Sequence, residues 1–319
     1  MSLAKASFTP GIDKQTSTYG AEGRWVDATN VRFRTGLPEK IGGWEKVVNS
    51  NICGAVRGMK AWVSNSGVRY VALGTDRKLY IYSEGIFYDV TPLRRSGIAL
   101  TDPFATTSGS PTITVTDSSH GFNVGDFVVY SNFSTVSGLD MNQEFEITAI
   151  GNTNTYTVTH TSNANATGSS LGGSGSEDAL LSVGTSVSTF GYGWGVGAWH
   201  TPSATSTVAL DATYWSLDTF GEDLLAIRNN DKLYKWDLSA GTGTRAAAIS
   251  GAPTSNRFTL VSSPDRHVFL FGTETTIGDP NTRDDLFLRF SSQEDPSTWN
   301  PLSTNSAGTF RIQDGSRIV

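Results

Sequence analysis

VALGTDRKLYIY, at residues 71–82, decides the fold, and it returns as LAIRNNDKLYKW at residues 225–236. In both stretches an apolar strand meets a polar turn, and Lys-Leu-Tyr then opens the return strand. A looser third copy joins residues 267–272 to residues 285–290 through a long loop. This recurrence indicates a repeat fold with a period of roughly 40 residues, broken by one insertion. The alternative is a chance similarity between hairpins.

The residues around the first copy predict a four-stranded antiparallel meander, because short apolar or alternating runs follow one another across tight turns. Such meanders are the units of β-propeller blades. The predicted fold class is therefore all-β, with propeller-like blades and an inserted small β-barrel module. Three recognisable blades do not close a propeller, which needs at least about four, so we expect further residues or another chain to complete it. The expected strands of the first blade are 56–63, 68–73, 78–83 and 86–90.

The predicted domains are an N-terminal arm with the first blade or blades (1–100), the inserted module (101–175) and further blades (176–319). The module is rich in Ser, Thr, Asn and Gly, and the turn HGFNVGD at residues 120–126 feeds one of its strands. The stretch SSLGGSGS at residues 169–176 has the composition of a flexible linker. We therefore expect the module to be a separable addition. Its expected strands are 112–116, 126–130, 144–150 and 155–160.

Composition excludes several classes of protein. Charged residues make up only 17% of the chain and 34 residues are Gly, as in proteins of short strands and many turns. Cys53 is the one cysteine, which excludes a disulfide framework within the chain and a cysteine-based metal site. No apolar run approaches the roughly 20 residues that span a bilayer, and Met1–Pro10 has no apolar signal region. We expect a protein without a membrane segment or secretion signal.

Charge is distributed unevenly along the chain. Residues 96–227 contain no Lys or Arg but twelve Asp and Glu, whereas the remainder carries 24 basic and 18 acidic residues. An acidic stretch disfavours nonspecific DNA binding, which depends on neutralising phosphates with Lys and Arg. Two interpretations remain open: a neutral surface covered by Ser and Thr, or an acidic wall that lets DNA slide past without sticking.

Residues that carry catalysis form no recognisable arrangement in this sequence. The four histidines, at 120, 160, 200 and 267, lack metal-ligand spacing, and there is no nucleophile elbow or phosphate-binding glycine loop. The acid pairs Glu222-Asp223 and Asp284-Asp285 are adjacent in sequence, so on a strand they point to opposite faces. We therefore expect no catalytic residues, no cofactor and no metal, and predict that the chain is not an enzyme. A propeller hydrolase remains a third hypothesis.

The stretch SQEDPSTW at residues 292–299 resembles the Asp-box turn of sialidase-type propellers, S-x-D-x-G-x-T-W. Here Glu294 takes the place of the Asp and Pro296 that of the Gly. The resemblance implies a structural brace in which Ser292, Glu294 and Trp299 hold the turn, and it implies no catalytic role.

Five stretches of the sequence carry a further resemblance: 8–14, 25–44, 214–226, 293–299 and 307–312. They are similar to tail proteins of short-tailed phages, in particular the nozzle or tail tubular protein B class and relatives that plug the portal. The resemblance implies a propeller platform present in six copies around a channel, docked below an adaptor ring, without catalytic residues. The inserted module, with its HGF-x-x-GD turn, also resembles a phage building block.

These expectations combine into one functional hypothesis, a structural protein of the virion tail, made in the host cytoplasm, that retains and then passes the genome. Its expected partners are itself, as a hexamer, the portal or adaptor ring, other tail proteins, and passing double-stranded DNA without specific binding. The alternative is a host-surface or glycan-binding tail adhesin. Candidate subunit or adaptor contacts are Arg24, Arg32 and Arg34 in the arm and Trp194 and Trp199 in a Gly/Trp-rich stretch. For the arm the alternative is an ordinary strand pair, and for the Gly/Trp-rich stretch a loop packed under a blade.

Overall fold

The computed structural model describes residues 8–43, 45–188 and 211–318 of the chain. The chain divides into two compact units, Met1–Asn49 and Ser50–Val319. The helices among the described residues are two short 3-10 turns, η1 (Leu238–Ala240) and η2 (Pro280–Thr282). Neither has the length and apolar character needed to cross a membrane. All other regular structure in the described residues is strand, so the predicted all-β fold class is confirmed.

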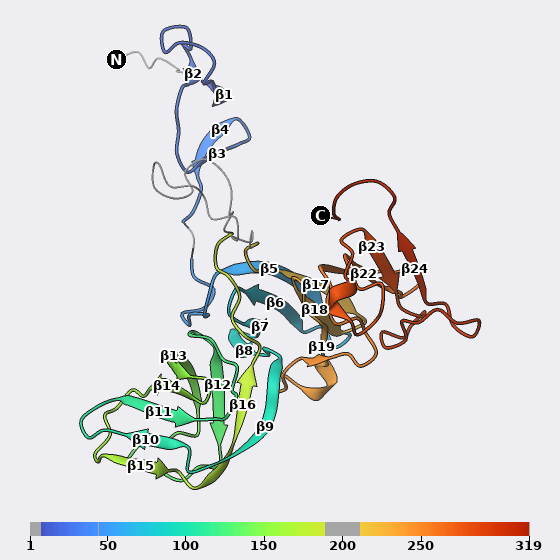
Figure 1. The fold of residues 1–319 in the computed structure, drawn as a ribbon. Helices are drawn as coiled ribbons and strands as arrows, with labels where there is room; N and C mark the ends of the chain where they lie inside the picture. The colour runs from blue at the N-terminus through green and yellow to red at the C-terminus, as the bar shows by residue number, and fades with distance from the viewer. Residues whose placement is uncertain (1–7, 44, 189–210, 319) are drawn as a thin grey trace, which may run out of the picture. The chain divides into compact units, whose positions relative to one another are not determined.

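The N-terminal unit consists of two small pairs of strands (Figure 1). Thr35 and Gly36 close the second pair with φ angles of 49° and 83°, the left-handed combination that a two-residue hairpin turn requires. Among the described residues of this unit, Ala21 is the buried hydrophobic side chain. Two-stranded pieces without a core are marginally stable in water, so this unit has the character of an arm. Its pairs are β1 (Thr9–Ile12) with β2 (Arg24–Trp25), and β3 (Val31–Arg34) with β4 (Leu37–Lys40).

Three four-stranded antiparallel sheets, each a meander in chain order, form the blades of the second unit (Figure 1). The repeat seen in the sequence falls on the second and third strands of each sheet, as a repeated blade requires. Blade 1 is β5 (Val56–Val63), β6 (Arg69–Thr75), β7 (Leu79–Ser83) and β8 (Ile86–Asp89). Blade 2 is β17 (Trp215–Phe220), β18 (Asp223–Arg228), β19 (Leu233–Trp236) and β20 (Ala247–Ala248). Blade 3 is β21 (Phe258–Val261), β22 (Val268–Phe271), β23 (Phe287–Phe290) and β24 (Gly308–Arg311).

The first strands of the three blades lie side by side, because β17 packs against both β5 and β21. The carboxylate of Asp218 on β17 joins them: Oδ1 accepts from Lys60 Nζ at 2.8 Å and Oδ2 accepts from the backbone N–H of Val261 at 2.7 Å. Ser216 and Thr259 exchange two further hydrogen bonds between β17 and β21. The blades are therefore arranged with their first strands together, as around the axis of a propeller.

Trp215 connects blade 2 to blade 1 through a recess made by two glycines. Gly58 and Gly74 are cross-strand partners on β5 and β6, and a Cβ atom added to either would lie within 2.4 Å of Trp215. The Trp215 indole donates its Nε1–H to the carbonyl of Thr75 at 2.7 Å. The absence of side chains at these glycines allows blade 2 to pack directly on the backbone of blade 1.

β18 has both faces buried, which explains its uninterrupted apolar run. Leu224 and Ala226 belong to the core between blades 1 and 2, whereas Leu225 and Ile227 belong to the core between blades 2 and 3. Because successive side chains of a strand point to opposite faces, a strand between two cores requires apolar residues at every position.

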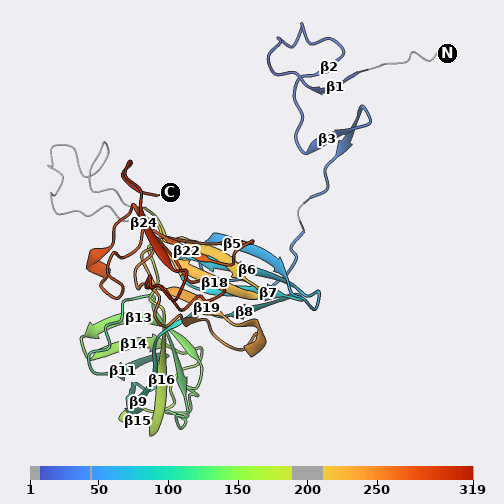
Figure 2. The ribbon, with the colours of Figure 1, turned by 90° about the vertical axis from the view of Figure 1, so that its right-hand side faces the viewer.

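The inserted module is one eight-stranded sheet (green in Figures 1 and 2) whose core is separate from both blade cores. Its strand order is β15-β10-β11-β14-β13-β12-β16-β9, and the described strands show no pairing between the edges β15 and β9. The sheet is thus not closed into a barrel by backbone hydrogen bonds. Its strands are β9 (Leu93–Thr101), β10 (Phe104–Thr106), β11 (Thr112–Thr116), β12 (Phe127–Ser131), β13 (Glu144–Asn152), β14 (Thr155–Thr159), β15 (Gly168–Leu171) and β16 (Ser174–Leu180).

Two sequence-based expectations about the module need correction. The sheet begins at Leu93 and ends at Leu180, so it extends beyond residues 101–175 at both ends. The stretch at residues 169–176 is not a linker, because it lies in β15 and β16, and β16 pairs with both β9 and β12. Its glycines allow close packing: a Cβ atom at Gly175 would lie 2.7 Å from the Phe133 ring. The glycines of this stretch therefore allow neighbouring side chains to pack against the backbone, and the Gly/Ser-rich composition does not indicate a flexible linker.

Candidate functional site

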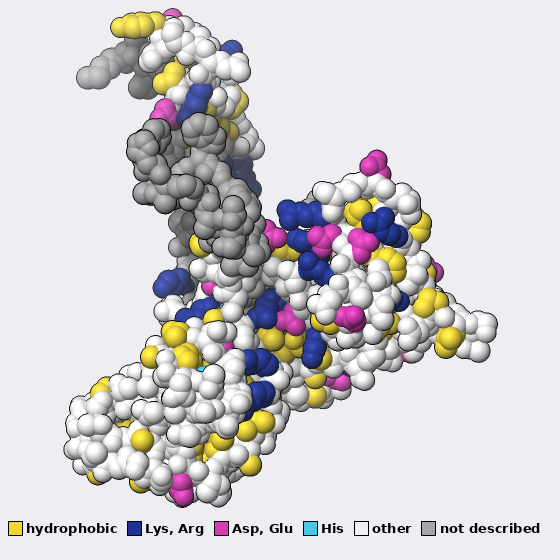
Figure 3. Space-filling view, in the orientation of Figure 1, with side chains coloured by type: hydrophobic (Ala, Val, Ile, Leu, Met, Phe, Trp, Pro, Cys, Tyr) yellow, Lys and Arg dark blue, Asp and Glu magenta, His cyan; other side chains and the backbone are white. Residues whose placement is uncertain are grey.

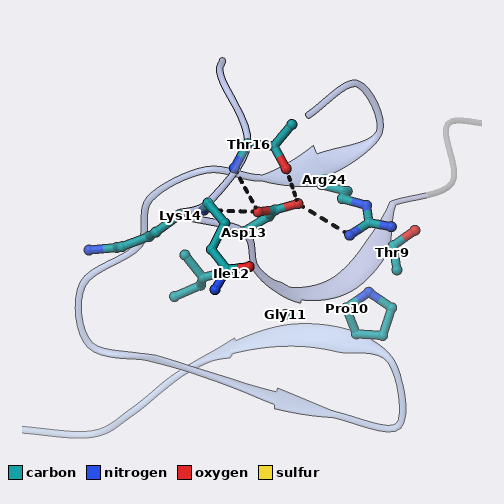
Figure 4. A pocket seen from close by; sticks show the side chains of 9 residues that line it. Thr9, Pro10, Gly11, Ile12, Asp13, Lys14, Thr16 and Arg24 are labelled. Carbon is teal, nitrogen blue, oxygen red and sulfur yellow. Dashed lines mark hydrogen bonds and ion pairs between the residues drawn. The ribbon is translucent and has the colours of Figure 1, made fainter. Parts of the chain in front are cut away.

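Arg24, a predicted contact residue, is engaged within the arm (Figure 4). Its NH1 lies 3.2 Å from Asp13 Oδ2, and the same carboxylate accepts hydrogen bonds from the Thr16 side chain and from the backbone of Gln15 and Thr16. The hydrogen bonds from Thr16 lead the causes that lower the pKa of Asp13. These residues border an open hollow of about 750 Å³. The carboxylate orders the loop that surrounds it.

The other predicted contact residues have different positions. Arg32 on β3 pairs with its cross-strand neighbour Glu39 at 3.1 Å, and both side chains are exposed. Arg34 is also exposed on β3. Trp194 and Trp199 lie outside the described residues. The structure thus leaves Arg32 and Arg34 at the surface of the arm, and pairs of this exposed kind add little stability.

The predicted turn brace is formed by different atoms than the sequence suggested. Trp299 is buried and donates its indole N–H to the carbonyl of Pro296 at 2.8 Å, and Ser292 pairs through its backbone with Thr298. The acid that braces the turn is Asp295, which accepts hydrogen bonds from the backbone and hydroxyl of Ser297. Glu294 instead occupies a left-handed position with a φ of 57°. The role assigned to Glu294 therefore belongs to the following residue.

An ion-pair network fastens the module to the blades. Lys78, at the start of blade 1's third strand, is buried and contacts Asp89 at 2.9 Å and also Glu144 of the module. Arg245, from the loop after β19, reaches the same two carboxylates at 3.1 and 3.7 Å. Burial alone would lower the pKa of Lys78, but the charges of Asp89 and Glu144 outweigh it and the pKa is raised. The network joins blade 1, blade 2 and the module.

The acidic middle of the chain is neutralised by the fold. Seven of its twelve carboxylates form ion pairs with Lys or Arg, and the other five accept hydrogen bonds from backbone amides. This pattern favours the neutral-surface interpretation over a DNA-repelling wall, and in Figure 3 the visible face of the module carries few charged side chains. The paired acids are Asp117, Glu144, Glu146, Glu177, Asp211, Asp218 and Asp223. The amide-bound acids are Asp102, Asp126, Asp140, Asp178 and Glu222.

The module encloses a buried polar cluster that the sequence did not reveal. The Tyr130 and Tyr156 hydroxyls lie 2.5 Å apart, and the Tyr156 hydroxyl donates to Oε2 of Glu177. The other oxygen, Oε1, has no hydrogen-bond partner among the described residues and lies 3.7 Å from Arg95. Burial raises the pKa of Glu177 to about 7. Nothing in the sequence separates Glu177 from a surface acid, because its partners come from three other strands.

The turn HGFNVGD performs a structural task. His120 is buried, accepts from the backbone N–H of Phe122 at Nδ1, and bonds the Asn152 carbonyl through Nε2. Asp126, also buried, accepts from the backbone of Asn123 and of Val183. In the described residues, no group of three His, Cys, Asp or Glu side chains is placed to hold a metal ion.

Both end faces of the three-blade stack are apolar. On blade 3, the face turned away from blade 2 is an aromatic and aliphatic surface across all four strands, with Leu260 51% and Phe310 61% exposed. On blade 1, the face turned away from blade 2 includes Met59 and Val63, which are 70% and 59% exposed. The registers place the following side chains on the blade 3 face: Phe258, Leu260, Phe269, Phe271, Leu288, Phe290 and Phe310.

Comparison with known proteins yields little. No family model matches the chain, and no curated protein matches it. Five chains of solved structures match, among them the phage phi92 endosialidase, at 15% sequence identity and a TM-score of 0.23. That match covers 78% of this chain and 47% of the endosialidase chain, so this chain spans about half the length of the matched protein.

One prediction from the sequence is contradicted by this match. The chain was expected not to be an enzyme, whereas an endosialidase is by its name an enzyme. The prediction that the chain is not an enzyme is therefore wrong as a general statement. No enzymatic activity is excluded. A match with a TM-score of 0.23 does not assign an activity to this chain either. The all-β fold is established by the order and register of the strands.

Proposed function

We propose that this chain is a component of a phage tail, in which its blades form part of a wall assembled from several copies. The observation that supports this is the pair of apolar end faces on the three-blade stack. Each blade-to-blade contact already present buries faces of this kind, and large exposed apolar patches mark surfaces that other proteins cover.

The finer proposal is a nozzle or conduit that retains and then passes the genome. It is supported by the resemblance of the arm and of several blade stretches to the nozzle class. An arm without a core, with Arg32 and Arg34 exposed, suits a strap that is ordered by contact with a neighbouring subunit or an adaptor ring. Arginine forms bidentate pairs with carboxylates of such a partner.

The test is the assembly state of the purified chain and its place in virions. We expect sedimentation velocity to show an oligomer, and electron cryo-microscopy of virions to place it in a ring below the portal. The double variant Leu260→Lys/Phe310→Lys should reduce assembly, whereas Thr309→Lys, on the opposite face of β24, is the control for added charge. A parent chain that is monomeric at all concentrations, and absent from the tail, would contradict the proposal.

A second candidate is a tail adhesin that binds host-surface glycans. The observation that favours it is a hollow of about 370 Å³ on the module, lined mainly by apolar atoms and bordered by Phe122 and Ile150. Binding to a glycan array that is lost in Ile150→Asp would support the adhesin, and a ring below the portal would support the nozzle.

A further inference from the structure

A hollow of about 430 Å³ opens in the second unit where five stretches of the chain meet: 183–185 after β16, 211–213 before β17, 228–230 at the end of β18, Arg257 before β21, and Arg283 after η2. Three arginines line it, Arg228, Arg257 and Arg283, whereas Asp211 is the acidic residue of the lining. The lining residues carry a net charge of +2, and Asp231 and Asp285, which pair with these arginines, lie next to them outside the lining. Concave positive surfaces concentrate anions.

Arg257 is the most deeply buried of these three arginines. Its side chain is only 7% exposed, and its Nε–H makes no hydrogen bond of good geometry among the described residues, although the Tyr214 hydroxyl lies beside the guanidinium. Its two terminal nitrogens each lie 3.4 Å from a carboxylate, of Asp285 and of Asp211. Charge-assisted hydrogen bonds are normally 2.7–2.9 Å long, so these contacts leave the guanidinium incompletely satisfied. A buried donor without an acceptor is unfavourable.

The other two arginines differ in how firmly they are held. Arg228 is fixed by Asp231 at 2.8 Å. Arg283 lies 3.5 Å from Asp285, the same carboxylate that Arg257 contacts. Two guanidiniums therefore share one carboxylate, and each guanidinium has five donors in a planar fork. Asp285 Oδ1 is buried and accepts no hydrogen bond among the described residues, so this carboxylate is poorly placed for both guanidiniums.

We propose that this hollow binds a compact oxyanion, the carboxylate of an acidic sugar or a phosphate group, between Arg257 and Arg283. Such a group can supply acceptors at the shorter distances of charge-assisted hydrogen bonds, whereas Asp211 and Asp285 lie 3.4 to 3.5 Å from these guanidiniums. The polar side chains of Asn229 and Thr185 on the same wall suit the hydroxyl groups of a sugar. The inference concerns a ligand site and goes beyond the proposed tail function.

The test is isothermal titration calorimetry of the full chain at low ionic strength, with inorganic phosphate and with glucuronate in separate titrations. Low salt is needed because ions screen such contacts. We expect saturable binding of at least one anion at millimolar concentrations or below. Arg283→Gln should weaken it about tenfold or more, because each tenfold corresponds to loss of one good charge-assisted contact. Arg311→Gln is the matched control, since Arg311 pairs with Asp284 and lies outside the lining.

The outcomes separate the ligand sources. Binding of phosphate alone identifies a phosphate group, and binding of glucuronate alone identifies a sugar carboxylate; both support the site. The absence of saturable binding to the folded parent would overturn it, as would unchanged affinity in Arg283→Gln. Arg257→Met tests the buried donor directly. Should that variant fail to fold, Arg283→Gln, whose side chain is partly exposed, decides the question.

Discussion

Glu177 is a carboxyl group that the module encloses completely, with the Tyr156 hydroxyl as its donor and Arg95 too far away for a hydrogen bond. Burial disfavours the charged form, which is why its pKa rises to about 7. The folded module therefore holds a proton on Glu177 at pH values where the unfolded chain has released it. Such a group makes stability depend on pH.

Glu177→Gln is expected to stabilise the protein strongly at pH 8 and only slightly at pH 5. The raised pKa means that stability declines as pH rises from about 4.5, the unfolded value, through 7, the folded one. The charged form costs on the order of 3 kcal/mol above pH 7, and glutamine keeps the acceptor for Tyr156 without the charge. Urea unfolding at both pH values measures this. An equal difference at the two pH values would show that Glu177 does not titrate in this range.

Trp299→Ala is expected to destabilise blade 3 by about 3–5 kcal/mol, the usual cost of truncating a large buried aromatic side chain. Trp299 is 1% exposed, belongs to the core between blades 2 and 3, and also holds the turn through Pro296. Thermal unfolding gives the measurement, with Trp299→Phe as a control that keeps most of the packing. A midpoint unchanged from the parent would mean that this core tolerates the cavity.

The strands of the blades show how one sequence pattern acquires different roles. Lys78 and Lys232 occupy the same place in the repeat, directly before a buried Leu-Tyr pair. Lys232 is exposed, whereas Lys78 is buried between Asp89 and Glu144. The difference comes from the module, because its Glu144 reaches Lys78, and no such partner is recorded for Lys232 among the described residues. The neighbouring Arg77 also contacts the module, through Glu146.

Lys78→Met is expected to lower the free energy of unfolding by about 1–3 kcal/mol, because it leaves two carboxylates with Arg245 as their remaining partner. The pKa of Asp89 is lowered, burial being outweighed by Arg245 and Lys78. Its contribution to stability is therefore present above its unfolded pKa and lost as the pH falls through the folded value. The variant should show less of this acid-dependent loss. Lys232→Met is the matched control, and similar effects at both lysines would contradict the assigned role.

The whole molecule combines three separate cores: one in the module and two between the blades. Sequence periodicity located the four strands of blade 1 and the second and third strands of the other two blades, because a repeated hairpin shows its strand positions in each copy. It also located module strands such as Thr112–Thr116 correctly. Sequence periodicity did not predict the environment of a side chain whose contacts come from residues distant in the chain. The burial of Glu177, the pairing of the acidic middle and the choice of Asp295 over Glu294 all depend on contacts or backbone angles that no local pattern encodes.

Replacing Asp102–Gly173 by a short Gly-Ser turn is expected to leave the blades folded. Thr101 and Ser174 are cross-strand partners on β9 and β16, so the new turn joins neighbouring strand ends. Lengthening or shortening such a connection changes the closure entropy only slowly. The loss of Glu144 should lower the melting temperature moderately, while unfolding remains cooperative in calorimetry. An insoluble product, or one without a cooperative transition, would show that the module is required for the blades to fold.

The enclosure of β18 on both sides has a consequence for how this chain can change over generations. A strand with one wet face accumulates neutral substitutions at every second residue. Leu224–Ile227 offers no such residue, since each side chain belongs to a core. Substitution there is confined to apolar side chains of similar volume, often accompanied by a compensating change in the adjoining blade. Lys232, in the turn that follows, is exposed and carries no such restriction, so the strand should keep its similarity among related proteins longer than such an exposed position does.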